Sequence, residues 1–271
     1  MIDDMFVFDQ HCHAFEPQDT IWGRIGQTYG EQIARMDRNG IDMSVSMAIF
    51  KITPEEQRLM TKYTVEAITK YPDRLIGFMW ATPLWGDQVL DDMRRAAEQG
   101  IRGLKLYAVA QGNFPLDSAL LDPMMKLARE LGWVVMAHTD VDSKVCHPLL
   151  GARLAHRNPE VKIVLSHMGM NSDVTHFVPE WVKDEPNCYL DTSASPNLPK
   201  YVYKTPMDVI PDRMLFGTDA PTLSPEVELK KVEIAEEMYG LTKDEKRKVL
   251  GTNAAALWGI DLKSPSLGVS K

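Results

Sequence analysis

The sequence has few cysteines, no long apolar run and no cluster of basic residues. Its three cysteines, Cys12, Cys146 and Cys188, are odd in number and far apart, which predicts reduced thiols rather than a disulfide framework. No apolar run approaches the roughly 18 residues of a membrane-spanning helix, and the first residues lack the basic and apolar regions of a signal peptide. Acidic residues outnumber basic ones by 38 to 30, which argues against nucleic acid as a partner. We therefore expect a cytoplasmic protein that binds neither membranes nor nucleic acid.

Short apolar runs alternate with longer amphipathic segments along the whole chain, which predicts a parallel α/β architecture. The runs that we interpret as strands cover residues 5–9, 43–49, 75–80, 101–106, 133–137, 161–165, 187–190 and 214–217. The segments that we interpret as helices cover residues 31–39, 53–70, 88–99, 118–131, 149–156, 174–184, 225–238 and 242–257. Residues 14–30 are predicted to form an irregular loop, because they are polar and interrupted by glycine.

Eight strands that alternate with helices over 271 residues predict a (β/α)₈ TIM barrel. One helix remains at the end, so we expect a single barrel domain over residues 1–260 with an extra C-terminal helix. Residues 261–271 are rich in Ser, Gly and Lys and predict a flexible tail. Capping boxes at Thr53–Glu56 and Thr242–Glu245 mark two of the helix starts.

Polar side chains stand where several of the predicted strands end. His11 and His13 close the first strand, and because they are two residues apart, they point to the same face. The other strand-end residues are Lys105 on the fourth strand, His138 after the fifth, His167 after the sixth and Asp219 after the eighth. In a TIM barrel these ends meet at one mouth. Four histidines and an aspartate meeting there predict a site for a divalent metal.

Each residue also has a second interpretation. His11 and His13 alone would fit two solvated histidines on an edge strand, and Asp219 could simply form a turn. His167 could be a metal ligand, an acid or base, or an oriented electrophile, and the non-ligand roles are favoured. Lys105 could hold a substrate carboxylate, bridge two metals if carboxylated, or form a structural ion pair.

Other polar residues carry weaker signals. Tyr107 and Arg24 are candidates for substrate contact but would equally fit packing or surface positions. The residues after the seventh strand, Asp191, Thr192 and Ser193, are candidates to line the pocket. The remaining histidines end no predicted strand, so we expect them in surface or loop positions: His147, His156 and His176.

This arrangement resembles the amidohydrolase superfamily, and in particular its amidohydrolase 2 branch of metal-dependent hydrolases, lactonases and decarboxylases. The resemblance spans about residues 6–260. The motifs that carry it are His11-x-His13, Gly103-Leu104-Lys105-Leu106, His138, Ser166-His167-Met168-Gly169, Asn187-Cys188-Tyr189-Leu190-Asp191-Thr192-Ser193, Gly217-Thr218-Asp219 and Gly251-Thr252-Asn253-Ala254-Ala255.

The resemblance implies a metal site with assigned roles. The ligands of one divalent metal, zinc or alternatively manganese, would be His11, His13, His138 and Asp219. Asp219 would also shuttle a proton, and His167 would act as an acid or stabilise an oxyanion.

Lys105, Arg24 and Tyr107 would contact a small anionic substrate. The resulting hypothesis is a hydrolase that cleaves an amide, ester or lactone bond in a small carboxylated substrate. The alternative is a non-oxidative decarboxylase of an aromatic or muconate-type acid, and a minor one is a binding barrel without catalysis. The His-x-His motif favours hydrolysis, because several decarboxylases of the branch have Glu-x-His instead. We also expect a homo-oligomer.

Overall fold

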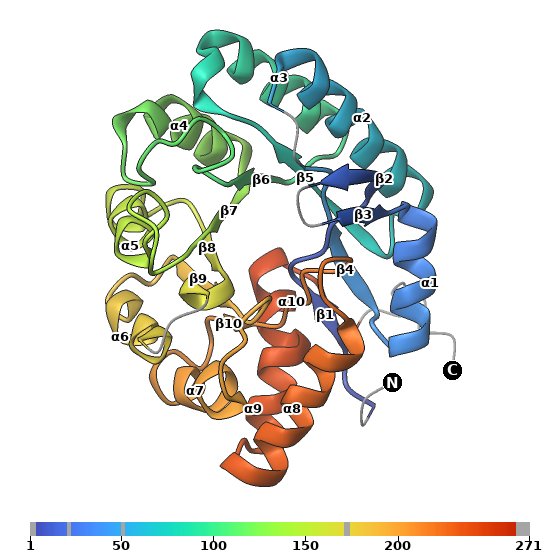
Figure 1. Cartoon of the computed structure of the whole chain (residues 1–271), viewed down its shortest axis with the longest axis vertical. Helices are drawn as coiled ribbons and strands as arrows, with labels where there is room; N and C mark the ends of the chain where they lie inside the picture. Colours follow the sequence, from blue (N-terminus) through green and yellow to red (C-terminus); the bar gives the residue numbers. More distant parts are fainter. Residues whose placement is uncertain (1–3, 21–22, 50–51, 171–173, 264–271) are drawn as a thin grey trace.

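Eight parallel strands surround the centre of the molecule, and the helices follow one another around them (Figure 1). This computed structural model describes residues 4–20, 23–49, 52–170 and 174–263. The strands, in their order around the barrel, are β1 (Phe8–Asp9), β4 (Met43–Ser46), β5 (Leu75–Trp80), β6 (Gly103–Leu106), β7 (Val134–His138), β8 (Ile163–Ser166), β9 (Cys188–Asp191) and β10 (Met214–Leu215). The predicted (β/α)₈ TIM barrel is confirmed, although β1 and β10 are shorter than expected.

The first and last strands meet through backbone hydrogen bonds beyond their ends. Gln10 N donates to Phe216 O at 2.8 Å, and Asp219 N donates to His11 O at 2.8 Å. A parallel bridge between Cys12 and Ala220 follows. These contacts nearly close the barrel, and they bring the segment that carries His11 beside the segment that carries Asp219.

The strands separate two apolar cores because successive side chains point to opposite faces. On β7, Val134 and Met136 belong to the cluster that fills the barrel, whereas Val135 and Ala137 belong to the cluster that packs against the helices. Continuing this alternation, His138 points inward at the last position of the strand. The polar residues therefore lie above a packed apolar interior, at the mouth of the barrel.

Ten α-helices lie within the described residues: α1 (Tyr29–Asn39), α2 (Pro54–Lys70), α3 (Asp87–Glu98), α4 (Asp122–Leu131), α5 (Pro148–Arg157), α6 (Val178–Val182), α7 (Thr205–Val209), α8 (Pro225–Tyr239), α9 (Lys243–Arg247) and α10 (Asn253–Trp258). Both predicted capping boxes are confirmed, since Thr53 accepts from Glu56 N and Thr242 accepts from Glu245 N. None of these helices is long and apolar enough to cross a membrane. Most of the tail predicted over 261–271, namely residues 264–271, falls outside the described residues.

The prediction of an irregular loop over residues 14–30 is wrong. The segment forms an antiparallel hairpin of β2 (Phe15–Thr20) and β3 (Gly23–Gln27), followed by the start of α1. Gly26 has φ +139°, and a Cβ there would lie 2.6 Å from Pro17 Cα. Glycine is thus required by the close approach of the two strands, and a glycine that looks like a loop signal in the sequence belongs to a strand.

Several helices differ from the prediction in detail. No helix was expected between the seventh and eighth strands, where a π-helical turn, η5 (Lys200–Lys204), and α7 occur. The predicted helices 118–131 and 174–184 begin with the short 3₁₀ turns η2 (Ala119–Leu121) and η4 (Thr175–Phe177). The last predicted helix is interrupted by a π-helical turn, η6 (Lys248–Thr252). A Cβ on Gly251 would lie 2.1 Å from Phe6 O, and such a contact between distant segments has no signal in the local sequence.

Candidate metal centre

The six strand-end side chains expected at the mouth lie together in the structure, and all six are buried. They line a cavity of about 220 Å³ together with five further residues: Ile25, Ile49, Tyr107, Met170 and Thr222. The strand alternation explains two of the six positions, because Lys105 continues the inward face of Gly103 and His138 that of Met136. The strand-end rule therefore locates the six residues around one cavity.

Three potential ligand atoms form a close triangle in this cavity. His11 Nε2 lies 3.2 Å from His13 Nε2, and Asp219 Oδ1 lies 3.0 Å from His13 Nε2 and 3.4 Å from His11 Nε2. In a tetrahedral site with ligands at about 2.1 Å, the ligand atoms are about 3.4 Å apart. The spacing of the triangle is thus close to what one divalent ion requires.

One polar atom of these ligand residues lacks a hydrogen-bond partner among the described residues. His13 Nδ1 is buried and has no hydrogen-bond partner among the described residues, although buried polar atoms are normally paired. The ligand atoms of His11, His167 and Asp219 also lie within 4.8 Å of one another. The donor set, two to three imidazoles with one carboxylate, is of the type that binds zinc or a similar ion.

Lys105 places a cation beside the triangle. Its Nζ lies 3.0 Å from His11 Nε2, and its side chain is almost completely buried. Burial lowers the pKa of Lys105 to about 8, against the opposing charges of Asp219 and Asp191. Lys105 donates to the nitrogen that a metal at His11 would use, so the two cations compete for one lone pair.

The electrostatics of the cavity favour metal ligands in their unprotonated forms. Burial lowers the pKa of each of the four histidines, and Lys105 lowers that of His11 further. Burial alone would raise the pKa of Asp219. The hydrogen bond with His13 and the imidazoles of His11 and His167 outweigh burial and hold this pKa below its usual range. At neutral pH the histidines are thus neutral and Asp219 is ionised.

Aromatic packing forms one wall of the cavity. The ring of Tyr107 lies against that of His138, with centroids 3.9 Å apart, and Trp80 packs behind Tyr107 at 6.4 Å. The ring of His138 is also 4.7 Å from that of His167. His138 is therefore held between two rings at the wall of the cavity.

Four residues at the sharp turns of the site have positive φ angles, which are costly for residues other than glycine. They are His167 (φ +67°), Met168 (φ +49°), Met170 (φ +60°) and Asp219 (φ +57°). At Asp219 the backbone N–H bonds to His11 O at 2.8 Å and so helps to hold this conformation. Such strain persists only where surrounding contacts impose it, and here it occurs at three residues that line the cavity: His167, Met170 and Asp219.

Sequence reasoning did not identify Asp9 and Gly217 as parts of the site. Asp9 Oδ1 accepts from His11 N at 3.1 Å and from Thr218 N at 2.9 Å, which joins the two polar segments. Burial raises the pKa of Asp9 to about 7. A Cβ on Gly217 would lie 2.9 Å from His11 Cβ. An acid at the end of an apolar strand was a usable signal for Asp9, whereas the close approach at Gly217 had none.

The prediction that Asp191, Thr192 and Ser193 line the pocket is wrong, since none of the three lies on the cavity surface. Asp191 and Ser193 stand behind the histidines. Arg24 belongs to β3, but its side chain falls outside the described part of the structure. As expected, the other three histidines do not line the cavity: His147 caps α5, His156 pairs with Glu185, and His176 packs on Phe177 and Tyr201.

A known family accounts for this combination of barrel and site. The family model described as amidohydrolase matches residues 8–260. The chain belongs to the amidohydrolase family. No curated protein sequence gives a significant match.

Solved structures of this amidohydrolase's fold include decarboxylases and a hydrolase, all at low identity. The 5-carboxyvanillate decarboxylase of Sphingomonas paucimobilis is 17% identical, with a TM-score of 0.73 over 95% of this chain and 100% of that one. A probable 2-pyrone-4,6-dicarboxylic acid hydrolase of Acinetobacter baumannii is 17% identical, with a TM-score of 0.68 over 94% and 100%. The corresponding decarboxylase of Novosphingobium aromaticivorans, crystallised with manganese and a nitrobenzoic acid, is 16% identical, with a TM-score of 0.73 over 94% and 97%. At these identities the likeness establishes the fold alone.

Proposed function

We propose that this amidohydrolase is a metal-dependent hydrolase that cleaves an amide, ester or lactone bond in a small carboxylated substrate. The observation that supports this most is the environment of Asp219. Its carboxylate is ionised at neutral pH and lies 3.0 Å from His13 Nε2, at the edge of a cavity large enough for a small molecule. It can therefore accept a proton from a water molecule that attacks the substrate.

The ligand atoms for one divalent ion would come from His11, His13 and Asp219, with His138 as the expected fourth residue. Zinc is the first candidate, and manganese is the alternative. When bound, such an ion would lower the pKa of a coordinated water towards about 7. Asp219 would hold the proton taken from that water and return it to the leaving group. His167 faces the same cavity and would assist by binding or moving a proton at its ring.

The rest of the cavity supports a small anionic substrate with an apolar body. Lys105 and Tyr107 provide an ammonium and a phenol, whereas Ile25, Ile49 and Met170 provide apolar surface. Burial raises the pKa of Tyr107, so its phenol stays protonated. Arg24 remains a proposed further contact for the substrate anion.

A second candidate is non-oxidative decarboxylation, in which carbon must receive a proton. Several of the structural neighbours are decarboxylases, of 5-carboxyvanillate or of 2,6-dihydroxybenzoate. With its pKa of about 8, Lys105 keeps its proton at pH 7 and could donate it. The neutral histidines and ionised Asp219 supply acceptors rather than donors, and this favours hydrolysis as the first proposal.

A single substrate panel separates the two reactions. The protein, loaded with zinc or manganese, is incubated with lactones, amides and carboxylated aromatics while acid release and CO₂ release are followed separately. We expect ring-opened or cleaved acids without CO₂, and Asp219→Asn with measured metal content serves as the control. Release of CO₂ without hydrolysis would establish the decarboxylase instead, and absence of both products would reject both candidates.

A further inference from the structure

A carboxylate behind the cavity, Asp191 at the end of β9, contacts both imidazole-bearing segments. It is fully buried and does not line the cavity. Its Oδ2 lies 3.0 Å from His11 Nδ1. Its Oδ1 accepts from His167 N at 3.0 Å and from Ser193 N at 3.1 Å, and also contacts the Ser193 hydroxyl. Asp191 therefore connects the end of β9 by hydrogen bonds to His11, which follows β1, and to His167, which follows β8.

The hydrogen-bond pattern fixes which nitrogen of His11 carries the proton. The backbone N–H groups of His167 and Ser193 can only donate, so Oδ1 of Asp191 acts as an acceptor, as a carboxylate oxygen does. The other oxygen faces His11 Nδ1, and the Ser193 hydroxyl oxygen, whose own proton goes to Oδ1, lies 3.0 Å from the same nitrogen. Both oxygens thus accept from His11 Nδ1, which donates. A neutral imidazole has one N–H. His11 Nε2, the atom that faces His13 and Asp219, is consequently a bare lone pair.

The same argument extends to His167 through Ser193. The Ser193 hydroxyl donates to Asp191, so its lone pairs are left to accept from His167 Nδ1 at 2.9 Å. The Ser193 carbonyl, which can only accept, lies 3.1 Å from the same nitrogen. His167 Nδ1 must therefore be protonated, which leaves its Nε2 as a lone pair.

We propose that Asp191 is a positioning residue that commits His11, and through Ser193 also His167, to the Nδ1–H form. Both rings then present an unprotonated Nε2 on the cavity side. A carboxylate behind a histidine that fixes its tautomer is a recurring arrangement at metal sites and in acid–base catalysis. The assignment of the tautomers depends on geometry alone, whereas its consequence for metal binding rests on the proposed function.

The wild-type protein tests the assignment directly. Metal-free protein labelled with ¹⁵N-histidine is studied by NMR at a pH where the imidazoles are neutral, and His11 and His167 are assigned by replacing each in turn. We expect the proton of both rings on Nδ1. A proton on Nε2 of either ring would overturn the proposal, and this result needs neither metal nor substrate.

The variant Asp191→Asn tests the cause. The backbone N–H groups would hold the amide oxygen in the place of Oδ1, so the amide NH₂ would face His11 Nδ1. His11 Nδ1 must then accept, and its proton moves to Nε2. We expect the reversed His11 tautomer in the spectrum and a loss of zinc or manganese affinity on the order of 10–100-fold.

Ser193→Ala is the comparison variant, because it removes the hydroxyl that contacts Asp191 and lies 3.0 Å from His11 Nδ1, but keeps Asp191 Oδ2 beside His11. We expect His11 to remain in the Nδ1–H form in this variant. A wild-type tautomer together with wild-type metal affinity in Asp191→Asn would overturn the proposal. If Asp191→Asn does not fold, the wild-type spectrum decides the assignment. If the wild-type protein binds no divalent ion, the proposed function fails, and the spectrum still decides the role of Asp191.

Discussion

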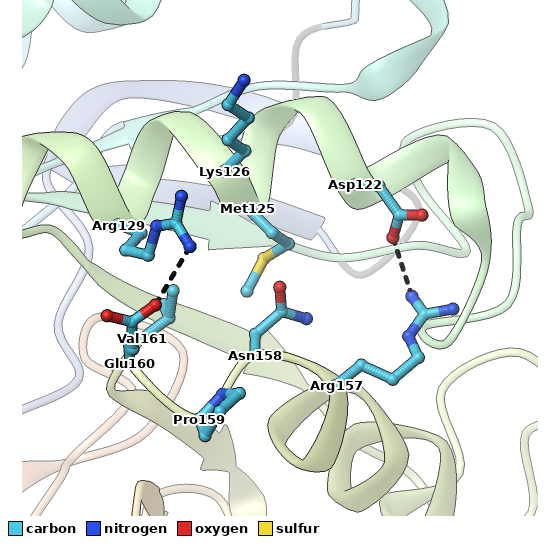
Figure 2. Close-up of a pocket in the computed structure, with 9 residues that line it drawn as sticks. All are labelled: Asp122, Met125, Lys126, Arg129, Arg157, Asn158, Pro159, Glu160 and Val161. Atoms are coloured by element: carbon cyan, nitrogen blue, oxygen red, sulfur yellow. Dashed lines mark hydrogen bonds and ion pairs between the residues drawn. The ribbon is translucent and has the colours of Figure 1, made fainter.

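Two hollows in the described part of the structure are of opposite character. The cavity at the mouth measures about 220 Å³ and is lined by buried imidazoles, a carboxylate and a lysine. The other, of about 500 Å³, lies between α4 and the segment that joins α5 to β8 (Figure 2). Four of its five charged side chains are already paired, since Arg129 bonds to Glu160 and Arg157 to Asp122, each at 3.0 Å (Figure 2).

The larger volume of a hollow therefore does not identify it as the functional site. Exposed ion pairs such as those of the larger hollow contribute little, on the order of 0–1 kcal/mol each. At the mouth, burial removes water from groups whose partners are incomplete, so their pKa values shift and a ligand can supply the missing interaction. The larger hollow adjoins the start of β8, and the N-terminal face of such barrels serves stability rather than catalysis.

The largest effect should follow removal of two ligands of the triangle. We predict that the double variant His11→Ala/His13→Ala loses both metal and activity but keeps its fold, because packed apolar layers below the mouth hold the barrel. Circular dichroism and metal content, measured on one preparation, check this prediction. Global unfolding would show instead that the histidines, or the metal itself, contribute much of the folding free energy.

The next largest effect concerns Asp219. Asp219→Asn removes the proton acceptor but keeps an oxygen that can face the metal, so turnover should fall by a factor on the order of 10²–10⁴. Metal content should fall less. Rate and metal occupancy must be measured together, because an empty site imitates a chemical defect.

His167→Asn is the comparison for Asp219→Asn. If His167 stabilises developing charge, turnover should fall on the order of 10²–10³-fold while the metal stays bound. Loss of metal from His167→Asn, with Asp219→Asn close to the wild type in both measures, would show that the two roles are reversed.

A smaller effect should appear in the stability of the metal-free protein. Burial lowers the pKa of Lys105 in the folded state to about 8, from its usual value of 10.5. This difference destabilises the folded state by about 3 kcal/mol at a pH where Lys105 is protonated both in the folded and in the unfolded protein. The cost is complete below pH 8 and disappears as pH rises towards 10.5, because the folded state releases its proton first. Lys105→Met should therefore be more stable than the wild type at pH 7, and urea unfolding should show the gain shrinking above pH 8. A gain that does not change with pH would contradict the assigned cause.

The strand ends could be predicted from the sequence because their signal is local. In Val134, Met136 and His138 the alternation and the position of the histidine stand within five residues. The partner of His11 could not be predicted, since Asp191 lies 180 positions away in the sequence. The same holds for Gly217, whose missing side chain makes room for His11.

The hairpin over the mouth was missed for a related reason. Gly26 and Pro17 read as loop signals, whereas in the structure they face each other across β2 and β3. The fold thus depends on periodic patterns that a single sequence displays. The hydrogen bonds that orient the side chains of the site depend on contacts between strands that are distant in the sequence. A single sequence does not reveal these contacts.

The smallest effect should come from the larger hollow. Glu160→Gln removes the partner of Arg129, whose side chain is 47% exposed and can be solvated by water instead. We expect the free energy of unfolding to change by on the order of 0–1 kcal/mol, and by less at high salt, with turnover and metal content unchanged. Asp122→Asn, which removes the partner of Arg157, is the matched control and should behave alike. A tenfold loss of turnover in Glu160→Gln alone would break the comparison, because it would show that this hollow is coupled to the mouth across the barrel.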